Sequence, residues 1–138
     1  MDLRAFLRAR VEPTRRSLLV AAGDLIAIVA FVVPGEIRHG FPPLEFPLRT
    51  LDTFVPFLIG WVIAAVLGGL YTSDALKNPR RILSWTVPAW VFALVVGHAL
   101  RASPLFHGGT SLSFFLVTLA VGGTVGIGWR LLVGYLTA

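Results

Sequence analysis

Few residues in this chain could do chemistry inside its apolar segments, because charged residues make up only 14% of its 138 positions. Asp24 is the single charge in the run from residue 17 to 35, and Arg130 interrupts the apolar C-terminal run. An ionisable side chain in lipid is costly unless it faces protein or water. An acid and a base at one depth could neutralise each other, either as a structural lock or as a proton or anion site.

The sequence leaves two placements of Arg130 open. If the last helix continues beyond it, Arg130 lies about 8–12 Å from the membrane boundary, at the depth of Asp24. The two residues then form an intramembrane charge pair. If that helix ends near Trp129, Arg130 extends to the headgroups, and Asp24 is protonated or bonded to a neighbouring hydroxyl.

A second polar group flanks the apolar runs at what we expect to be the outer end. A hairpin arrangement would bring two loops to one face, and His98 and Arg101 would share a helix face because they are three residues apart. The group is either a solvated loop region or a site for a small anion or a headgroup. Its members are Glu36, Arg38, His39 and Asp52 around the first loop, and His98, Arg101 and His107 around the second.

Signatures of catalysis and of metal binding are missing from the sequence. It contains no H-E-x-x-H, G-x-S-x-G or phosphate-loop pattern, and no histidine pair at helical ligand spacing. A single deep acid leaves no partner for a paired-carboxylate mechanism. The absence of cysteine excludes disulfides and thiolate metal sites. We therefore expect no enzymatic activity, no metal and no cofactor.

The intervals between charges indicate the elements that must position these residues. Residues 53–73, 82–100 and 102–129 carry no charge, and about 20 apolar residues suffice for one helical crossing of a bilayer. With 56% hydrophobic residues and a mean hydropathy of +0.80, the composition excludes a water-soluble globule. We predict one all-α domain over residues 17–138, a four-helix transmembrane bundle. Its helices are expected near 15–34, 52–71, 83–101 and 111–135, with Pro34-Gly35 ending the first.

Lysine and arginine set the expected orientation. Eight of them lie in the N-terminal segment and the connection between the second and third helices, against three on the other side. The richer side should be cytoplasmic. We predict a plasma-membrane protein with both termini inside. Residues 1–16 form a basic arm, either a short helix in the membrane interface or a frayed topology signal.

Small residues recur at four-residue spacing along the apolar segments. Such rows let helix backbones approach closely in lipid. They serve packing within this bundle or contact with a second copy. The residues concerned are Gly60, Ala64, Gly68, Ala93, Gly97, Gly122 and Gly126.

Several blocks of the chain resemble a known family. They are AAGDLIAIVAFVVPGEIRHG (21–40), FVPFLIGWVIAAVLGGLY (54–71), PRRILSWTVPAW (79–90) and the segment Gly128 to Arg130. They are similar to small archaeal and bacterial membrane proteins catalogued as domain of unknown function 3054. The resemblance covers roughly residues 17–132 and implies an integral membrane protein, often haloarchaeal. It implies no activity, cofactor or catalytic residue.

The leading hypothesis is a non-enzymatic membrane protein that binds or moves a small ion or solute, with Asp24 and Arg130 as its charged centre. Because four short helices enclose little volume, a pathway would need a homo-oligomer. One alternative is an accessory or assembly subunit that docks another membrane protein. Another is a membrane-bound enzyme acting on lipid at the outer polar group. Membrane lipids are the expected surroundings, and nucleic-acid binding is not expected, because the chain has no soluble basic module.

Overall fold

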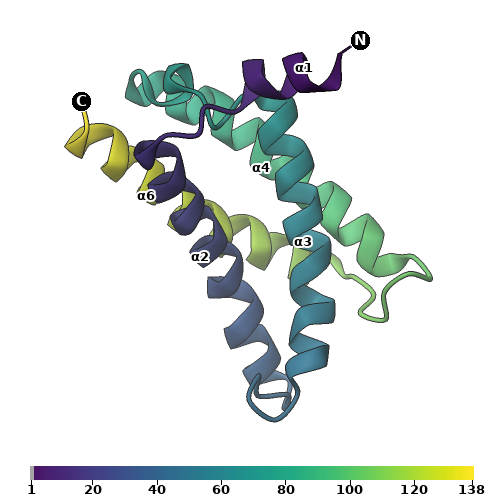
Figure 1. Ribbon diagram of the computed structural model, residues 1–138. Coiled ribbons are helices and arrows are strands. Elements are labelled where there is room, and N and C mark those ends of the chain that lie inside the picture. The colour runs from purple at the N-terminus through teal and green to yellow at the C-terminus, as the bar shows by residue number, and fades with distance from the viewer. Residues whose placement is uncertain (1) are drawn as a thin grey trace.

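The computed structural model describes residues 2–138, whose regular structure is helical apart from one isolated β-bridge between Val11 and Tyr71 (Figure 1). Four helices are long and apolar enough to cross a membrane, and they pack together. The predicted fold class is therefore confirmed, and the chain is a multi-pass membrane protein. The elements are α1 (Leu3–Arg10), α2 (Arg15–Arg38), α3 (Pro47–Gly68), the 3-10 turn η1 (Ser73–Leu76), α4 (Pro79–Ala102), α5 (Leu112–Val117), the π-turn η2 (Thr118–Gly122) and α6 (Gly123–Leu136).

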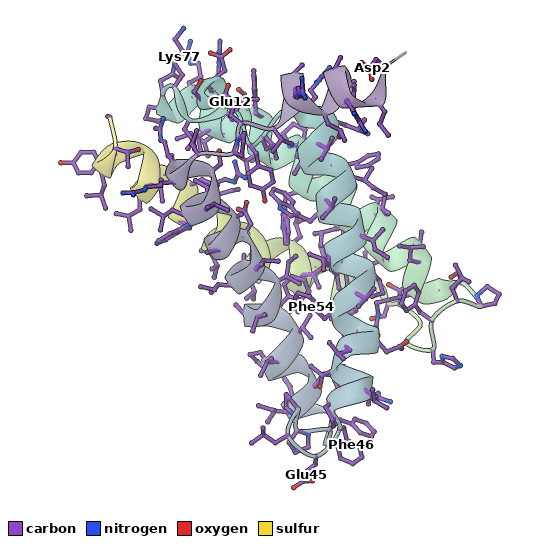
Figure 2. The ribbon with its side chains drawn as sticks, in the orientation of Figure 1. Asp2, Glu12, Glu45, Phe46, Phe54 and Lys77 are labelled. Carbon is purple, nitrogen blue, oxygen red and sulfur yellow. The ribbon has the colours of Figure 1, made fainter. Side chains whose placement is uncertain are left out.

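The bundle has two distinct ends. Helix α1, the connection 69–78 and the C-terminus gather at the end drawn at the top of Figure 1, which we call the arm end. Loop 39–46 joins α2 to α3 at the opposite end, which we call the far end, and loop 103–111 joins α4 to α5. Figure 2 shows Glu12 and Lys77 at the arm end, and Glu45 and Phe46 at the far end.

Side-chain caps fix where three of the spans begin. Thr14 accepts a hydrogen bond from the backbone N–H of Ser17, and Ser111 accepts one from Phe114. Asn78 caps α4, which starts with Pro79 in its first turn. These residue types satisfy N–H groups that have no partner in the helix, and proline has no N–H to lose there.

Four predicted boundaries are wrong: the end of the first span, both ends of the second, and the start of the third, where α4 begins at Pro79 and not at residue 83. Helix α2 does not end at Pro34-Gly35 but runs to Arg38, because one missing N–H leaves the surrounding ladder intact; Gly40, with φ +86°, follows the end of the helix. Helix α3 starts five residues earlier than predicted, at Pro47, and ends before Gly69 in the left-handed conformation. Tyr71, predicted as the end of this span, therefore lies in the connection to α4.

The fourth span is continuous but irregular. It runs from Leu112 to Leu136 through the π-turn η2, which the sequence did not predict. At this turn Thr118 is fully buried, and its hydroxyl donates to the carbonyl of Phe115 over 2.9 Å. The extra residue in the turn shifts the register of α6 relative to α5.

The small residues let the spans approach closely at some of the predicted positions. A Cβ on Gly60 would overlap the backbone of Ala93, and one on Gly122 would overlap the Trp90 ring. Ala64 and Gly97 are buried as well. The other two differ: Gly68 is exposed and Gly126 is half-buried, with only ordinary contact to its neighbours.

The N-terminal arm is attached to the bundle rather than separate from it. Helix α1 is amphipathic, with Leu3 and Leu7 exposed. Beyond it, the Arg10 Nη1 donates to the Leu67 carbonyl over 2.6 Å, and the backbone N–H of Glu12 donates to the Tyr71 carbonyl over 2.9 Å. The arm thus lies across the ends of α3 and the connection that follows it.

Candidate functional site

Asp24 on α2 and Arg130 on α6 form a two-pronged ion pair. The Arg130 Nε donates to Asp24 Oδ1 over 3.0 Å, and Nη2 donates to Oδ2 over 2.7 Å. Arg130 is 0% exposed and Asp24 is 4% exposed. The placement of Arg130 at the headgroups is wrong, because the helix does not end at Trp129 but continues through α6 to Leu136.

The pair is enclosed by further hydrogen bonds. The Tyr71 hydroxyl donates to Asp24 Oδ2 over 2.7 Å and accepts from the Trp61 Nε1 over 2.9 Å. The remaining Arg130 nitrogen, Nη1, donates to the Leu70 carbonyl over 3.1 Å. Burial, followed by the negative charge of Asp24, raises the pKa of Tyr71 above its ordinary value, so Tyr71 stays a donor at neutral pH.

The cavity that Asp24 lines is too small for a solute. The cavity next to Asp24 measures about 10 Å³, about the size that holds one water molecule. An ion pair whose atoms are bonded on all sides fixes the positions of the helices that carry it. The Asp24–Arg130 pair therefore joins α2 to α6.

A much larger cavity of about 320 Å³ lies at the far end of the bundle. We call it the Arg101 cavity. It is bounded by the C-terminal turns of α2, the start of α3, the end of α4 and the segment 108–114. Its charged and titratable side chains are Glu36, His39, Arg49 and Arg101, and its apolar walls include Phe31, Val32 and Phe114.

Arg101 is the only one of these cations that is buried, with 8% of its surface exposed. Its Nε donates to the Gly109 carbonyl over 3.0 Å, and its guanidinium carbon lies 5.1 Å from the centre of the Phe114 ring. A Cβ on Gly108 would overlap the guanidinium, so loop 103–111 folds closely around it. Within residues 2–138, the Nη1 atom is buried without a hydrogen-bond partner, and Arg101 forms no salt bridge.

Glu36, by contrast, is fully engaged. It is 7% exposed, and its two oxygens accept from the Thr53 hydroxyl over 2.6 Å and from the Arg49 Nε over 3.1 Å. The Arg49 guanidinium also stacks on the Phe41 ring, 3.6 Å from its centre. Glu36 is thus paired with Arg49, whereas within residues 2–138 no acid lies in salt-bridge contact with Arg101.

The structure divides the polar group that the sequence placed at this end. Glu36, His39 and Arg101 line the cavity, whereas Arg38 and Asp52 do not. The Asp52 carboxylate accepts from the backbone N–H of His107 over 3.4 Å.

His98 is buried in a separate environment. Its Nε2 lies 3.0 Å from the Thr118 hydroxyl, and its Nδ1 contacts the Thr110 hydroxyl. Its ring packs edge-to-face against Phe57 and Phe114. His98 therefore connects α4 to the π-turn and does not face the cavity.

Sequence reasoning missed several residues of both sites. Arg49 and Thr53 were missed because α3 was predicted to start at residue 52; their spacing of four residues on one helix face was the available signal. Tyr71 was predicted as the end of the second span, and nothing in its spacing links it to Asp24.

Aromatic rings separate the cavity from the ion pair. Phe31 packs edge-to-face against Phe57 and Trp90, with ring centres 5.0 and 6.1 Å apart. Trp90 in turn lies 5.7 Å from Trp61, which bonds Tyr71 of the buried network. The Arg101 cavity is thus closed toward the middle of the bundle.

Comparison with known proteins gives a family. No curated protein and no solved structure matches the chain. The family model described as "Protein of unknown function (DUF3054)" matches residues 21–133, which include all of α3 and α4, most of the first and fourth spans, and both sites described above. The chain therefore belongs to the DUF3054 family.

Proposed function

We propose that this multi-pass membrane protein binds a small solute in the Arg101 cavity. The observation that carries the proposal is the buried guanidinium of Arg101, whose Nη1 has no hydrogen-bond partner within residues 2–138 and which lines a cavity of about 320 Å³. A buried, unpaired donor on a charged group is costly. A ligand that accepts its hydrogen bond removes this cost on binding.

We propose that the cavity opens to the outside of the plasma membrane. The arm end carries eight lysine and arginine residues, and the far end carries three. The positive-inside rule then places both termini in the cytoplasm. The eight are Arg4, Arg8, Arg10, Arg15, Arg16, Lys77, Arg80 and Arg81, and the three are Arg38, Arg49 and Arg101.

The proposal is of binding without chemistry. Glu36 is the acid in the cavity, and both of its oxygens already accept hydrogen bonds. These bonds hold it between Thr53 and Arg49, so we assign it a positioning role in the cavity wall rather than a catalytic one. His98 is held by the hydroxyls of Thr110 and Thr118 and does not itself line the cavity.

The Asp24–Arg130 pair supports this function indirectly. It lies behind the aromatic layer and next to a cavity of only about 10 Å³, so we propose that it locks the bundle rather than receiving the solute. The Arg101 cavity forms within a single chain, so binding needs no second copy. Movement of solute across the membrane would require the rings of Phe31, Phe57 and Trp90 to part.

Cysteine labelling tests access to the cavity, since the chain has no cysteine of its own. Gly35 lines the cavity, and a Cβ there would meet open space, so Gly35→Cys introduces a thiol with little disturbance. A membrane-impermeant maleimide added outside intact cells should label Gly35→Cys. The matched control, Lys77→Cys in the exposed arm-end connection, should be labelled only after the membrane is permeabilised.

Protection then tests binding itself. A panel of small anions, amines and neutral solutes is added before the maleimide to the purified full chain in nanodiscs. At least one class should slow labelling of Gly35→Cys and leave labelling of Lys77→Cys unchanged. The proposed function is wrong if Gly35→Cys is never labelled, or if no member of the panel changes its rate.

A further inference from the structure

We infer that the ligand of the Arg101 cavity is a small organic carboxylate bound by the Arg101 guanidinium. This inference rests on the proposed function, because it names the class of solute that the same cavity takes. It follows from three separate properties of the cavity: its charge, the form of its free donor, and its walls.

The charge balance points to an anion with one negative charge. Glu36 and Arg49 pair with each other over 3.1 Å and cancel. Arg101 has no such partner within residues 2–138. The other two acids at this end, Glu45 and Asp52, do not line the cavity, and Asp52 accepts a hydrogen bond from the His107 backbone. A monoanion therefore matches the single unpaired charge, whereas a cation would meet Arg101 without a free acid to receive it.

The form of the donor points to oxygen acceptors in a plane. A guanidinium presents its N–H groups in a rigid planar fork that suits carboxylate and phosphate oxygens. The Nε bond to Gly109 and the contact with Phe114 hold this fork in place. The guanidinium is therefore already oriented before a ligand arrives, which lowers the entropy cost of binding.

The walls point to an anion with an apolar body. Phe31, Val32 and Phe114 line the cavity together with its polar groups. A volume of about 320 Å³ lies at the small end of the range for ligand pockets, roughly 300–1,000 Å³. A hydrated inorganic anion would leave these rings against water, whereas a carboxylate on a small hydrocarbon or aromatic group would cover them.

The test compares three probes of one shape and different charge: benzoate, benzamide and benzylamine. Each is added to the purified Gly35→Cys chain in phosphatidylcholine nanodiscs, and the rate of maleimide labelling is measured. Benzoate should protect at a concentration at least about tenfold lower than benzamide, because a hydrogen bond to a charged group is the stronger one. Benzylamine should give no protection.

Variants of Arg101 in the Gly35→Cys background test the assigned residue. In Arg101→Gln the half-protecting concentration of benzoate should rise at least about tenfold. Arg101→Lys should retain part of the protection, because it keeps the charge but lacks the fork. Arg38 lies at the same end but outside the cavity, so in Arg38→Gln the half-protecting concentration of benzoate should be the same as with native Arg38. If Arg101→Gln does not fold, the inference is still tested by comparing benzoate with benzamide on the Gly35→Cys chain that keeps Arg101.

Two further measurements distinguish an organic carboxylate from inorganic phosphate and from an anionic lipid headgroup. Inorganic phosphate that protects as well as benzoate would overturn the organic carboxylate. Phosphatidylglycerol nanodiscs that slow labelling without any added probe would replace it with a lipid headgroup. Equal protection by benzamide or benzylamine would also overturn the inference, while leaving solute binding in place. A failure of every probe, in contrast, would remove the proposed function itself.

Discussion

At the scale of single residues, the Asp24–Arg130 pair and Arg101 differ in how completely they are hydrogen-bonded. Arg130 and Asp24 satisfy each other inside the bundle, and Tyr71 and the Leu70 carbonyl complete their bonding. Arg101 is almost as well buried but keeps Nη1 unpaired within the described chain. A completed network stabilises a structure, and the incomplete one at the cavity wall is the basis of the solute binding that we propose.

Removing one member of the ion pair should destabilise the bundle strongly. Asp24→Asn or Arg130→Met each leaves a buried group without its partner, and we expect the free energy of unfolding to fall by about 3–5 kcal/mol. The double variant should lose much less than the sum of the two, because no uncompensated charge remains. Unfolding by dodecyl sulfate in mixed micelles measures all three. If Asp24→Asn keeps full stability but abolishes the protection of Gly35→Cys by solute, the structural role of the Asp24–Arg130 pair is ruled out.

Tyr71 offers a test of the same network by pH. Its raised pKa means that the folded state holds the phenol proton more tightly than the unfolded state does. The resulting stability is complete below the ordinary tyrosine pKa of about 10 and is lost as the pH rises above it. The chain has two tyrosines, so in Tyr135→Phe the ultraviolet titration reports Tyr71 alone. Tyrosinate should appear at higher pH in the folded protein than after denaturation; coincident curves would contradict the network.

At the scale of the elements, close helix contacts depend on particular glycines. A Cβ on Gly60 would overlap the Ala93 carbonyl, which is backbone and cannot rotate away. Gly60→Ala should therefore force α3 from α4 and cost about 1–3 kcal/mol. Gly128 on α6 is the matched control, because a Cβ there meets open space; Gly128→Ala should be neutral or stabilise by up to about 1 kcal/mol. Equal unfolding midpoints of the two variants would disprove this contact.

The sequence predicted the elements better than their ends. Charge-free runs identify four spans because lipid demands long apolar helices. The third span nevertheless starts at Pro79, capped by Asn78, and not at residue 83 as predicted. The far end was harder, since Pro34 and Pro47 are read locally as breaks although one lies within α2 and the other opens α3. The π-turn depends on the contact of Thr118 with His98 across two helices, which no local pattern encodes.

The two sites were likewise predicted only in part. The depth argument brought Asp24 and Arg130 together as one of two alternatives, since both residues are rare charges in apolar runs. The cavity was recognised only as a loose group of far-end residues. Its key property, the burial of Arg101 under Gly108 and Gly109, depends on how loop 103–111 folds back, and sequence spacing does not specify that.

At the scale of the whole molecule, the orientation can be measured directly. Leu44, in the loop between α2 and α3, is 99% exposed, and Lys77 is exposed at the arm end. Because the arm end carries most of the positive charge, Leu44→Cys should react with an impermeant maleimide on intact cells and Lys77→Cys should not. The reverse pattern would invert the proposed topology and place the Arg101 cavity on the cytoplasmic side.

The contact between Asp24 and Arg130 also bears on how the protein is made. The two residues are 106 positions apart, so the ribosome delivers the acid of the first span long before its base. Throughout that interval the nascent protein carries a carboxyl group in lipid with no cation to receive it. Chains released early, without α6, keep this defect permanently. Quality-control proteases of the membrane would thus encounter incomplete chains with an unpaired Asp24 carboxyl group, which complete chains do not have.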